Sequence, residues 1–183
     1  MRRVLVCLAG VAMLAACSKA PAPAANAAAP ANAAPATPAA PTAPVAASGA
    51  AVSGSYTVDG KPAALSVVTT HTDDPFDGKP IVDIIFTEKD PAGDADPATD
   101  AAFGNFGDAI VAKVEPDGTV VGADIVHTAL NNHGASVSLS GVLTMQDYKV
   151  AGGQISGHLT SDGPTDVFGQ KVAIDLTFHA KAP

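Results

Sequence analysis

Five histidines are the first side chains of this sequence that could do chemistry, because imidazole binds transition metals and exchanges protons near neutral pH. They are His71, His127, His133, His158 and His179. No two of them have the close helical spacing that would supply two ligands of a zinc-type site locally. His127 and His133 flank a predicted turn and could approach each other across it. They are candidates for a two-histidine metal site, and solvated turn histidines are the preferred alternative.

His158 and His179 lie on the outward faces of two neighbouring predicted strands. If these strands pair as a simple hairpin, with Thr160 opposite Lys171, the two imidazoles are separated by about 20 Å at about 3.3 Å per residue. We therefore expect that they do not share a metal ion.

The acidic stretch from Asp90 to Asp100 offers the oxygen ligands that calcium prefers, because Asp94 and Asp96 could direct two carboxylates at one ion. The stretch departs from the EF-hand loop, since it lacks the third Asp or Asn, the glycine in register and the distal glutamate. A solvated acidic loop is the preferred interpretation, and a calcium site at Asp94 and Asp96 is the alternative.

No residue pattern of a known catalytic site is evident. A Gly-x-Ser-x-Gly turn is missing from the sequence, and the only glutamates are Glu88 and Glu115, which makes a glycosidase-type pair unattractive. Ser136, Ser138 and Ser140 alternate, as they would on a polar strand face. We predict no catalytic residue, and a hydrolase with scattered carboxylates is the least favoured function.

The N-terminus has the features of a secretory signal peptide over residues 1–16. Arg2 and Arg3 precede an apolar run that is too short to span a bilayer, and small residues follow. The sequence Leu14-Ala15-Ala16-Cys17 resembles the lipobox of Gram-negative bacterial lipoproteins, in which cleavage precedes the cysteine. The resemblance implies that Cys17 carries diacylglycerol and a further acyl chain such as palmitate, and that Ser18 favours the outer membrane.

Lipidation on Cys17 implies lasting attachment to that membrane, because several acyl chains bind far more strongly than one. Cys7 would be removed with the signal peptide, so the mature chain would contain no free thiol. Residues 17–50 follow as a linker, with 17 Ala and 7 Pro after the cysteine. Proline interrupts each helical run and there is little to bury, so we predict a disordered tether.

Residues 51–183 form the remaining domain, which is strongly acidic. Its seven Lys and 18 Asp plus Glu give a net charge of −11, whereas the whole chain has −8. This charge argues against nucleic acid as a partner and would suit a basic protein. No cofactor is expected beyond the covalent lipid.

Alternation of apolar and polar residues dominates this domain, most clearly from Val172 to Phe178. Turn pairs such as Asp59-Gly60 and Gly152-Gly153 separate the alternating segments. We expect about eight strands, near 52–58, 63–71, 80–88, 109–115, 119–129, 135–146, 153–161 and 171–180. One short helix is expected at Ala98–Phe106, with Thr99 as its cap.

These elements predict an all-β, antiparallel domain, arranged as a meander-like barrel or a sandwich. Two segments depart from alternation, Ile81–Phe86 and Val120–Val126, which are nearly all apolar. They are expected either to be central strands covered on both sides, for which the short helix is one candidate cover, or to lie beneath a partner. The sequence indicates the function only in general terms. We expect an outer-membrane lipoprotein with a non-catalytic β domain, in the periplasm or at the cell surface, that binds a partner. The alternative is a metal- or small-ligand-binding lipoprotein.

Overall fold

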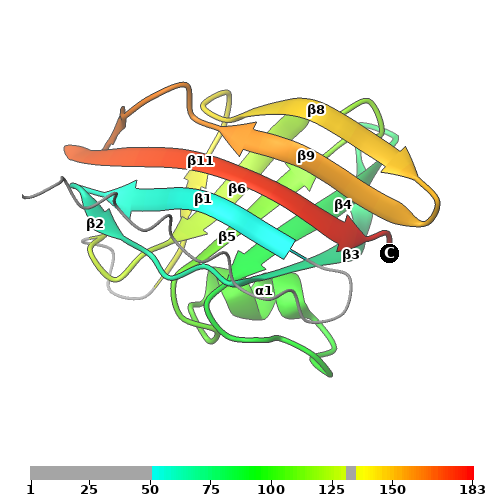
Figure 1. Cartoon of the computed structure of the whole chain (residues 1–183), viewed down its shortest axis with the longest axis horizontal. Helices are drawn as coiled ribbons and strands as arrows, with labels where there is room; N and C mark the ends of the chain where they lie inside the picture. Colours follow the sequence, from blue (N-terminus) through cyan, green and yellow to red (C-terminus); the bar gives the residue numbers. More distant parts are fainter. Residues whose placement is uncertain (1–50, 131–134) are drawn as a thin grey trace, which may run out of the picture. The chain divides into compact units, whose positions relative to one another are not determined.

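The computed structural model describes residues 51–130 and 135–183 (Figure 1). The chain divides into two units, Met1–Thr42 and Ala43–Pro183, and the described residues belong to the second. The predicted signal peptide, the lipobox with Cys17 and the predicted tether lie outside the described residues, as does His133.

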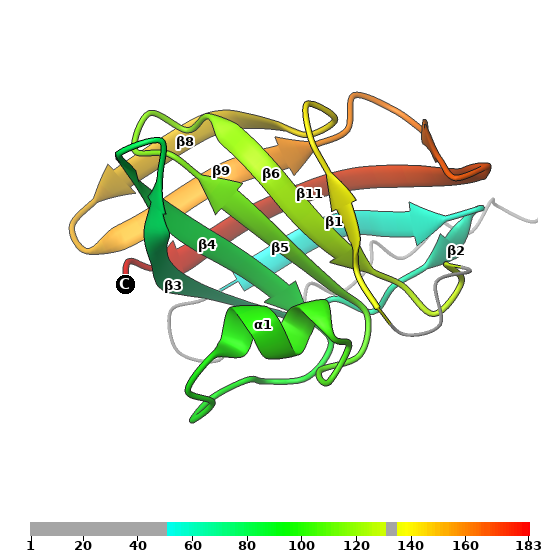
Figure 2. The same cartoon turned by 180° about the vertical axis from the view of Figure 1, so that it is seen from behind.

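Two antiparallel sheets pack face to face in this unit (Figures 1 and 2). Sheet A has the strand order β2-β1-β11-β9-β8, with β10 paired to β11. Its strands are β1 (Ala51–Val58), β2 (Lys61–Pro62), β8 (Thr144–Ala151), β9 (Gln154–Thr160), β10 (Thr165–Val167) and β11 (Gln170–Lys181). The prediction of an antiparallel all-β domain is confirmed, and of its two alternatives the structure is the sandwich.

Sheet B has the strand order β3-β4-β5-β6-β7, which is a meander as predicted. Its strands are β3 (Val67–Phe76), β4 (Lys79–Thr87), β5 (Ala109–Val114), β6 (Val120–Val126) and β7 (Val137–Leu139), and helix α1 (Pro97–Ala102) lies between β4 and β5. Sheet A departs from a meander, because β11 lies between β1 and β9 and pairs Ala51 with His179. The first and last strands are therefore neighbours.

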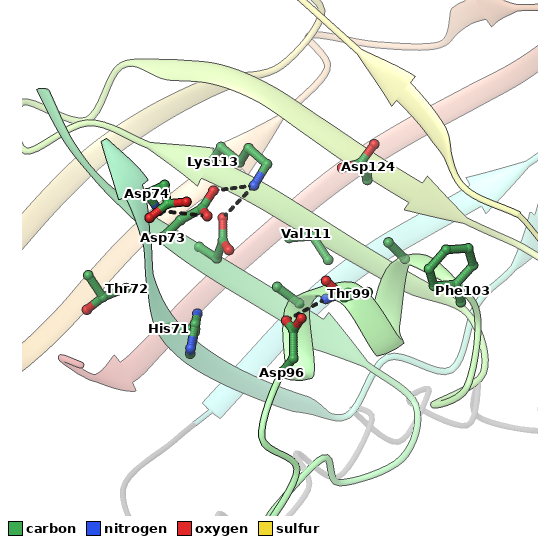
Figure 3. A pocket seen from close by; sticks show the side chains of 13 residues that line it. His71, Thr72, Asp73, Asp74, Asp96, Thr99, Phe103, Val111, Lys113 and Asp124 are labelled. Carbon is green, nitrogen blue, oxygen red and sulfur yellow. Dashed lines mark hydrogen bonds and ion pairs between the residues drawn. The ribbon is translucent and has the colours of Figure 1, made fainter. Parts of the chain in front are cut away.

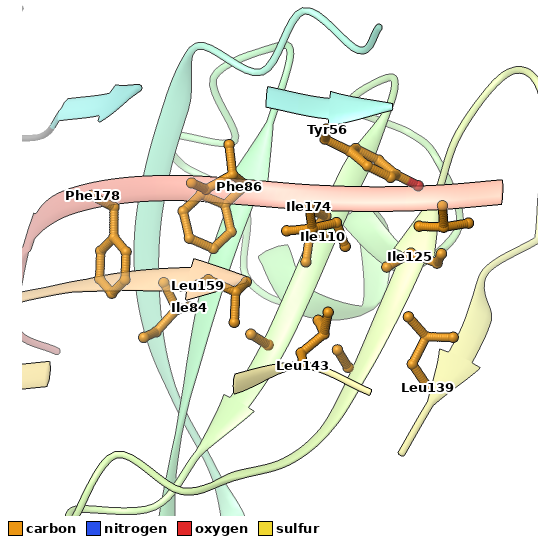
Figure 4. Packing of buried hydrophobic residues seen from close by; sticks show 14 of the residues in the cluster. Tyr56, Ile84, Phe86, Ile110, Ile125, Leu139, Leu143, Leu159, Ile174 and Phe178 are labelled. Atoms are coloured by element: carbon orange, nitrogen blue, oxygen red, sulfur yellow. The ribbon is translucent and has the colours of Figure 1, made fainter. Parts of the chain in front are cut away.

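Alternating apolar residues of both sheets fill the space between them (Figure 4). In β11 the alternate residues Val172, Ile174, Leu176 and Phe178 are buried, while Asp175 and Thr177 are exposed. The rings of Phe86 and Phe178 meet edge to face across the sheets, with centroids 5.4 Å apart. Aromatic pairs prefer this geometry, which adds to the stabilisation from burial alone.

The predicted strand at 135–146 is wrong in one respect, because it is two strands in different sheets. Its first part is β7 in sheet B and its second part begins β8 in sheet A. Gly141 lies between them with φ of 68°, a left-handed conformation that glycine adopts without steric cost. The alternation of apolar and polar residues continues across this turn, so the sequence pattern did not reveal the break between the two strands.

Helix α1 is shorter than predicted and begins earlier. Asp96, rather than Thr99, caps it, and its Oδ1 accepts a hydrogen bond from the Thr99 backbone N–H at 3.2 Å. Ala101 of α1 is fully buried in a cluster with Ile85 and Val111, on the outer face of sheet B. This contact confirms the expected cover by the helix at Ile85 of the apolar run 81–86.

Candidate functional site

A groove of about 480 Å³ crosses the outer face of sheet B beside helix α1 (Figure 3). Strand pairing determines which side chains lie on its floor. His71 of β3 is opposite Asp83 of β4, and Asp83 is opposite Lys113 of β5. Because side chains directly opposite each other in an antiparallel sheet share a face, the three form one row across the sheet.

Asp83 is the buried member of this row. Its side chain is 2% exposed, and its Oδ1 lies 3.3 Å from Lys113 Nζ. The same ammonium donates to Oδ2 of Asp73 at 2.5 Å, and both of these side chains are 34% exposed. A single lysine therefore neutralises part of the charge of two carboxylates.

Burial and charge shift the pKa values of this cluster in different directions. Burial raises the pKa of Asp83, and the Lys113 charge opposes that rise. The pKa of Asp73 is lowered, chiefly by its hydrogen bond from Lys113. Burial alone would lower the pKa of Lys113, but its bonds and charge interactions with Asp73 and Asp83 raise it overall. Lys113 thus remains an ammonium.

The rest of the groove adds carboxylates and an apolar surface. Asp74, Asp96 and Asp124 line it together with Val111 and Phe103. Phe103 follows α1 and is 64% exposed, and the Asp124 carboxylate accepts a hydrogen bond from Ser138. With Asp73 and Asp83 the lining contains five carboxylates against the single ammonium of Lys113. This arrangement attracts a cationic group and gives it an apolar contact.

His127, one of the two candidate metal ligands, is buried, so the preferred expectation of a solvated turn histidine is wrong for this residue. Both of its ring nitrogens have protein partners. Nδ1 accepts from the Ala129 backbone N–H at 2.9 Å, which assigns the proton to Nε2, and Nε2 donates to the Lys61 carbonyl at 3.1 Å. Asp108 Oδ2 lies 3.6 Å from Nε2, and the Tyr56 ring meets the imidazole edge on at 5.0 Å. Its predicted partner His133 lies outside the described residues.

Asp94 and Asp96 each bond to nearby backbone. Asp94 Oδ1 accepts from the Asp96 N–H at 2.9 Å, and Asp96 caps α1. Asp96 lines the groove, whereas Asp94 is outside its lining. Within residues 51–130 and 135–183, no group of three or more His, Cys, Asp or Glu side chains is arranged to hold a metal ion.

The predicted separation of His158 and His179 is wrong. Thr160 pairs with Asp175 rather than Lys171, because β10 and its hairpin to β11 occupy part of the chain that a simple hairpin would use. His158 is consequently opposite Thr177, and His179 is its diagonal neighbour, at about 7–8 Å rather than 20 Å. His158 Nε2 lies 2.8 Å from Asp175 Oδ1.

Sequence reasoning missed the row His71, Asp83 and Lys113. A signal was available, because Asp83 is the single charge within the apolar run 81–86 and Lys113 is the single charge of β5. A charge at such a position is rarely buried unless it has a partner. The pairing itself requires the register of β4 and β5, which the sequence does not show.

The comparisons with known proteins give no relative from which a role could be transferred. No protein-family model, curated protein or solved structure matches the chain. None of the helices in the described part of the chain is long and apolar enough to cross a membrane.

Proposed function

We propose that this protein is an outer-membrane lipoprotein, acylated on Cys17, whose β sandwich binds a cationic group of a basic protein partner in the groove on sheet B. The observation that carries the proposal is the buried carboxylate of Asp83 on the floor of an open groove lined by four further carboxylates. The lipobox motif supports the location, and the groove supports the binding chemistry.

The groove chemistry supports binding rather than catalysis. Its charged groups are five carboxylates, of which Asp73 and Asp83 share Lys113, and His71 lies at the end of the row. Carboxylates held in a partly buried cleft stabilise an ammonium or guanidinium more strongly than exposed carboxylates do, because water screens the interaction less. Phe103 and Val111 offer the apolar contact that the stem of a lysine or arginine side chain uses.

The net charge of the domain supports a basic partner independently. A charge of −11 over residues 51–183 attracts cationic proteins over a distance of about 8–10 Å at moderate ionic strength. Such attraction raises association rates, and the groove supplies the place where one cationic side chain is held.

A tetra-arginine peptide labelled with a fluorophore tests the binding by anisotropy at low and moderate salt. We expect Asp74→Asn/Asp124→Asn to weaken binding by about threefold or more, since two ionic contacts of the groove lining are removed. The matched control is Asp90→Asn/Asp94→Asn, which changes net charge equally outside the groove lining. Equal weakening by both double variants would show that only net charge matters, and would refute a groove site.

Metabolic labelling with an alkyne fatty acid tests the membrane attachment. We expect label on the natural chain and none on Cys17→Ser, with the natural chain in the outer-membrane fraction. Label that persists in Cys17→Ser, or an unlabelled natural chain, would refute acylation at this residue.

A further inference from the structure

The predicted linker joins the sandwich at Ala51, beside the last residues of β11. Ala51 pairs with His179, and this is the last pairing between β1 and β11. β11 continues to Lys181, which pairs with Gln154 of β9 on its other side. On the side of β1, Ala180 and Lys181 therefore have no strand partner among the residues that the structure describes.

A pocket of about 370 Å³ lies between this end of β11 and strand β3. Its surface is mainly apolar, and it is lined by Val68, Thr69, Thr70, Lys181, Ala182 and Pro183. β3 contacts both β1 and β11, and Thr70 Oγ1 donates a hydrogen bond to the Lys181 carbonyl oxygen at 2.7 Å. β3 is also the end strand of sheet B, so no further strand of that sheet covers its outer edge at the pocket.

The last residues of the predicted linker match this pocket in chemistry. Val45 is the single branched aliphatic residue in residues 18–50, most of which are Ala or Pro. No charged residue occurs in residues 20–50. A valine side chain gains free energy when it leaves water for an apolar surface, and no neighbour within the linker is large enough to supply that surface. Val45 is therefore the residue of the linker that an apolar pocket would hold.

Val45 is near enough along the chain to reach the pocket of its own sandwich. It precedes Ala51 by six residues, which span up to about 20 Å at about 3.3 Å per residue. The pocket lining begins at Lys181, two residues beyond the partner of Ala51 and so about 7 Å along β11. So short a connection favours a contact within one molecule over a contact with a second copy, because the effective concentration of the segment at its own pocket is high.

We propose that Val45 occupies the pocket at Val68–Thr70 and Lys181–Pro183 of its own chain, so that the last residues of the linker belong to the sandwich. The tether then consists of residues 17–44 rather than 17–50. The contact lies on β3 directly before His71, where the same strand begins to line the groove. The two linings share no residue, so the linker supports the edge of β3 without occupying the groove.

Photo-crosslinking in cells tests this contact in the full chain. Photo-leucine, an aliphatic diazirine, replaces Val45, and in the matched control it replaces Ala34 of the same linker. We expect a crosslink within a chain of monomer mass, mapped by peptide mass spectrometry to residues 68–70 or 181–183, from position 45 only. A product of twice the chain mass would identify a second copy as the occupant and overturn the proposal. A crosslink to lipid, to another protein or to another surface would also overturn it, as would the same crosslink from position 34 or no crosslink.

Protection from a protease gives a second test that leaves Val45 in place. Elastase cleaves after small residues, which occur throughout the linker, and a docked segment is cleaved only when it is released. We expect cleavage between residues 45 and 50 to be at least about tenfold faster in Val45→Asp than in the natural chain, because an unpaired aspartate is unfavourable in an apolar pocket. Ala34→Asp, the matched control, should be cleaved there at the natural rate.

Equal cleavage rates in the natural chain and Val45→Asp would contradict the docking of this segment. Both variants change only the linker, so the sandwich itself keeps its sequence. Neither test alters Cys17 or the groove, so their outcome is independent of the proposed acylation and of the proposed cationic partner.

Discussion

Lys113 Nζ lies 3.3 Å from Asp83 Oδ1, and the two residues are direct cross-strand partners in β5 and β4. The carboxylate is almost fully buried, whereas the ammonium is about one-third exposed. A buried charge without a partner is costly, so the ammonium compensates a carboxylate that lies in the middle of the apolar run 81–86. The pair therefore contributes to the stability of sheet B and to the charge of the groove.

Removing Lys113 alone should destabilise the domain. We expect Lys113→Met to lower the free energy of unfolding by about 1–3 kcal/mol, because the carboxylate of Asp83 loses its ammonium partner. The double variant Asp83→Leu/Lys113→Met should lose less than the single variant, since no buried charge remains. Urea unfolding of the variants measures this. A double variant as unstable as the sum of both single variants would contradict the coupling.

The pH dependence of stability should have opposite signs at Asp73 and Asp83. The pKa of Asp73 is lowered, so its stabilising contribution is present above its unfolded pKa and is lost as the pH falls through the folded value, below about pH 4. The pKa of Asp83 is raised, so its contribution is greatest below the unfolded value and declines as the pH rises through the folded value.

Urea unfolding of the natural chain, Asp73→Asn and Asp83→Asn between about pH 3 and pH 7 measures these signs. We compare the free energy of unfolding of the natural chain with that of each Asn variant. The advantage of the natural chain over Asp73→Asn should grow as the pH rises, whereas its advantage over Asp83→Asn should shrink. Each variant serves as the control for the other, because both remove one carboxylate from the same cluster. If these two differences in unfolding free energy changed with pH in the same direction, the environment assigned to Asp73 or to Asp83 would be incorrect.

Gly54 is required where β1 approaches β11. Its φ is 117°, and a Cβ added there would lie 2.0 Å from the Asp175 carbonyl oxygen, so the backbone would have to move. We expect Gly54→Ala to cost at least about 2 kcal/mol of unfolding free energy. Gly60→Ala is the control, because Gly60 also has positive φ but nothing lies within 4 Å of its added Cβ. Comparable losses at both positions would exclude the close approach as the cause.

Phe168→Asn should stabilise the domain, because Phe168 has φ of 51° in the two-residue loop between β10 and β11. Asparagine suits the left-handed position of a two-residue loop, so we expect a gain of about 0.5–1.5 kcal/mol in thermal unfolding measurements. Phe76→Asn should change stability by less than about 0.5 kcal/mol, since Phe76 is also exposed but is outside the residues with positive φ. A loss of stability in Phe168→Asn would show that the ring contributes to the fold.

Local patterns predicted four of the strands closely, because alternation and turn residues act over a few neighbouring positions. The strand expected near 63–71 is shifted to β3 at Val67–Phe76, and β10 was not predicted. β1, β4, β5 and β11 lie within a residue or two of their expected bounds. The error at 135–146 has a physical cause: the same alternation serves two sheets whose inner faces both point at one core. Alternation reports which side chains face inward, but not which sheet they belong to.

Register could not be predicted from local patterns. A hairpin rule gave the pairing Thr160 with Lys171, but β10 inserts its own hairpin and moves the pairing to Asp175. The groove depends on the same kind of information, since Asp83 and Lys113 are 30 residues apart in the chain. Their contact exists only after β4 and β5 align, with α1 in the connection between them.

The most direct test of the proposed function is an NMR titration of the labelled mature chain with the tetra-arginine peptide. We predict that the largest, saturable amide shifts fall on groove residues such as His71, Lys113 and Asp124, and that they shrink in Asp74→Asn/Asp124→Asn but persist in Asp90→Asn/Asp94→Asn. Shifts spread evenly over acidic surfaces, or concentrated away from the outer face of sheet B, would contradict a cation-binding groove.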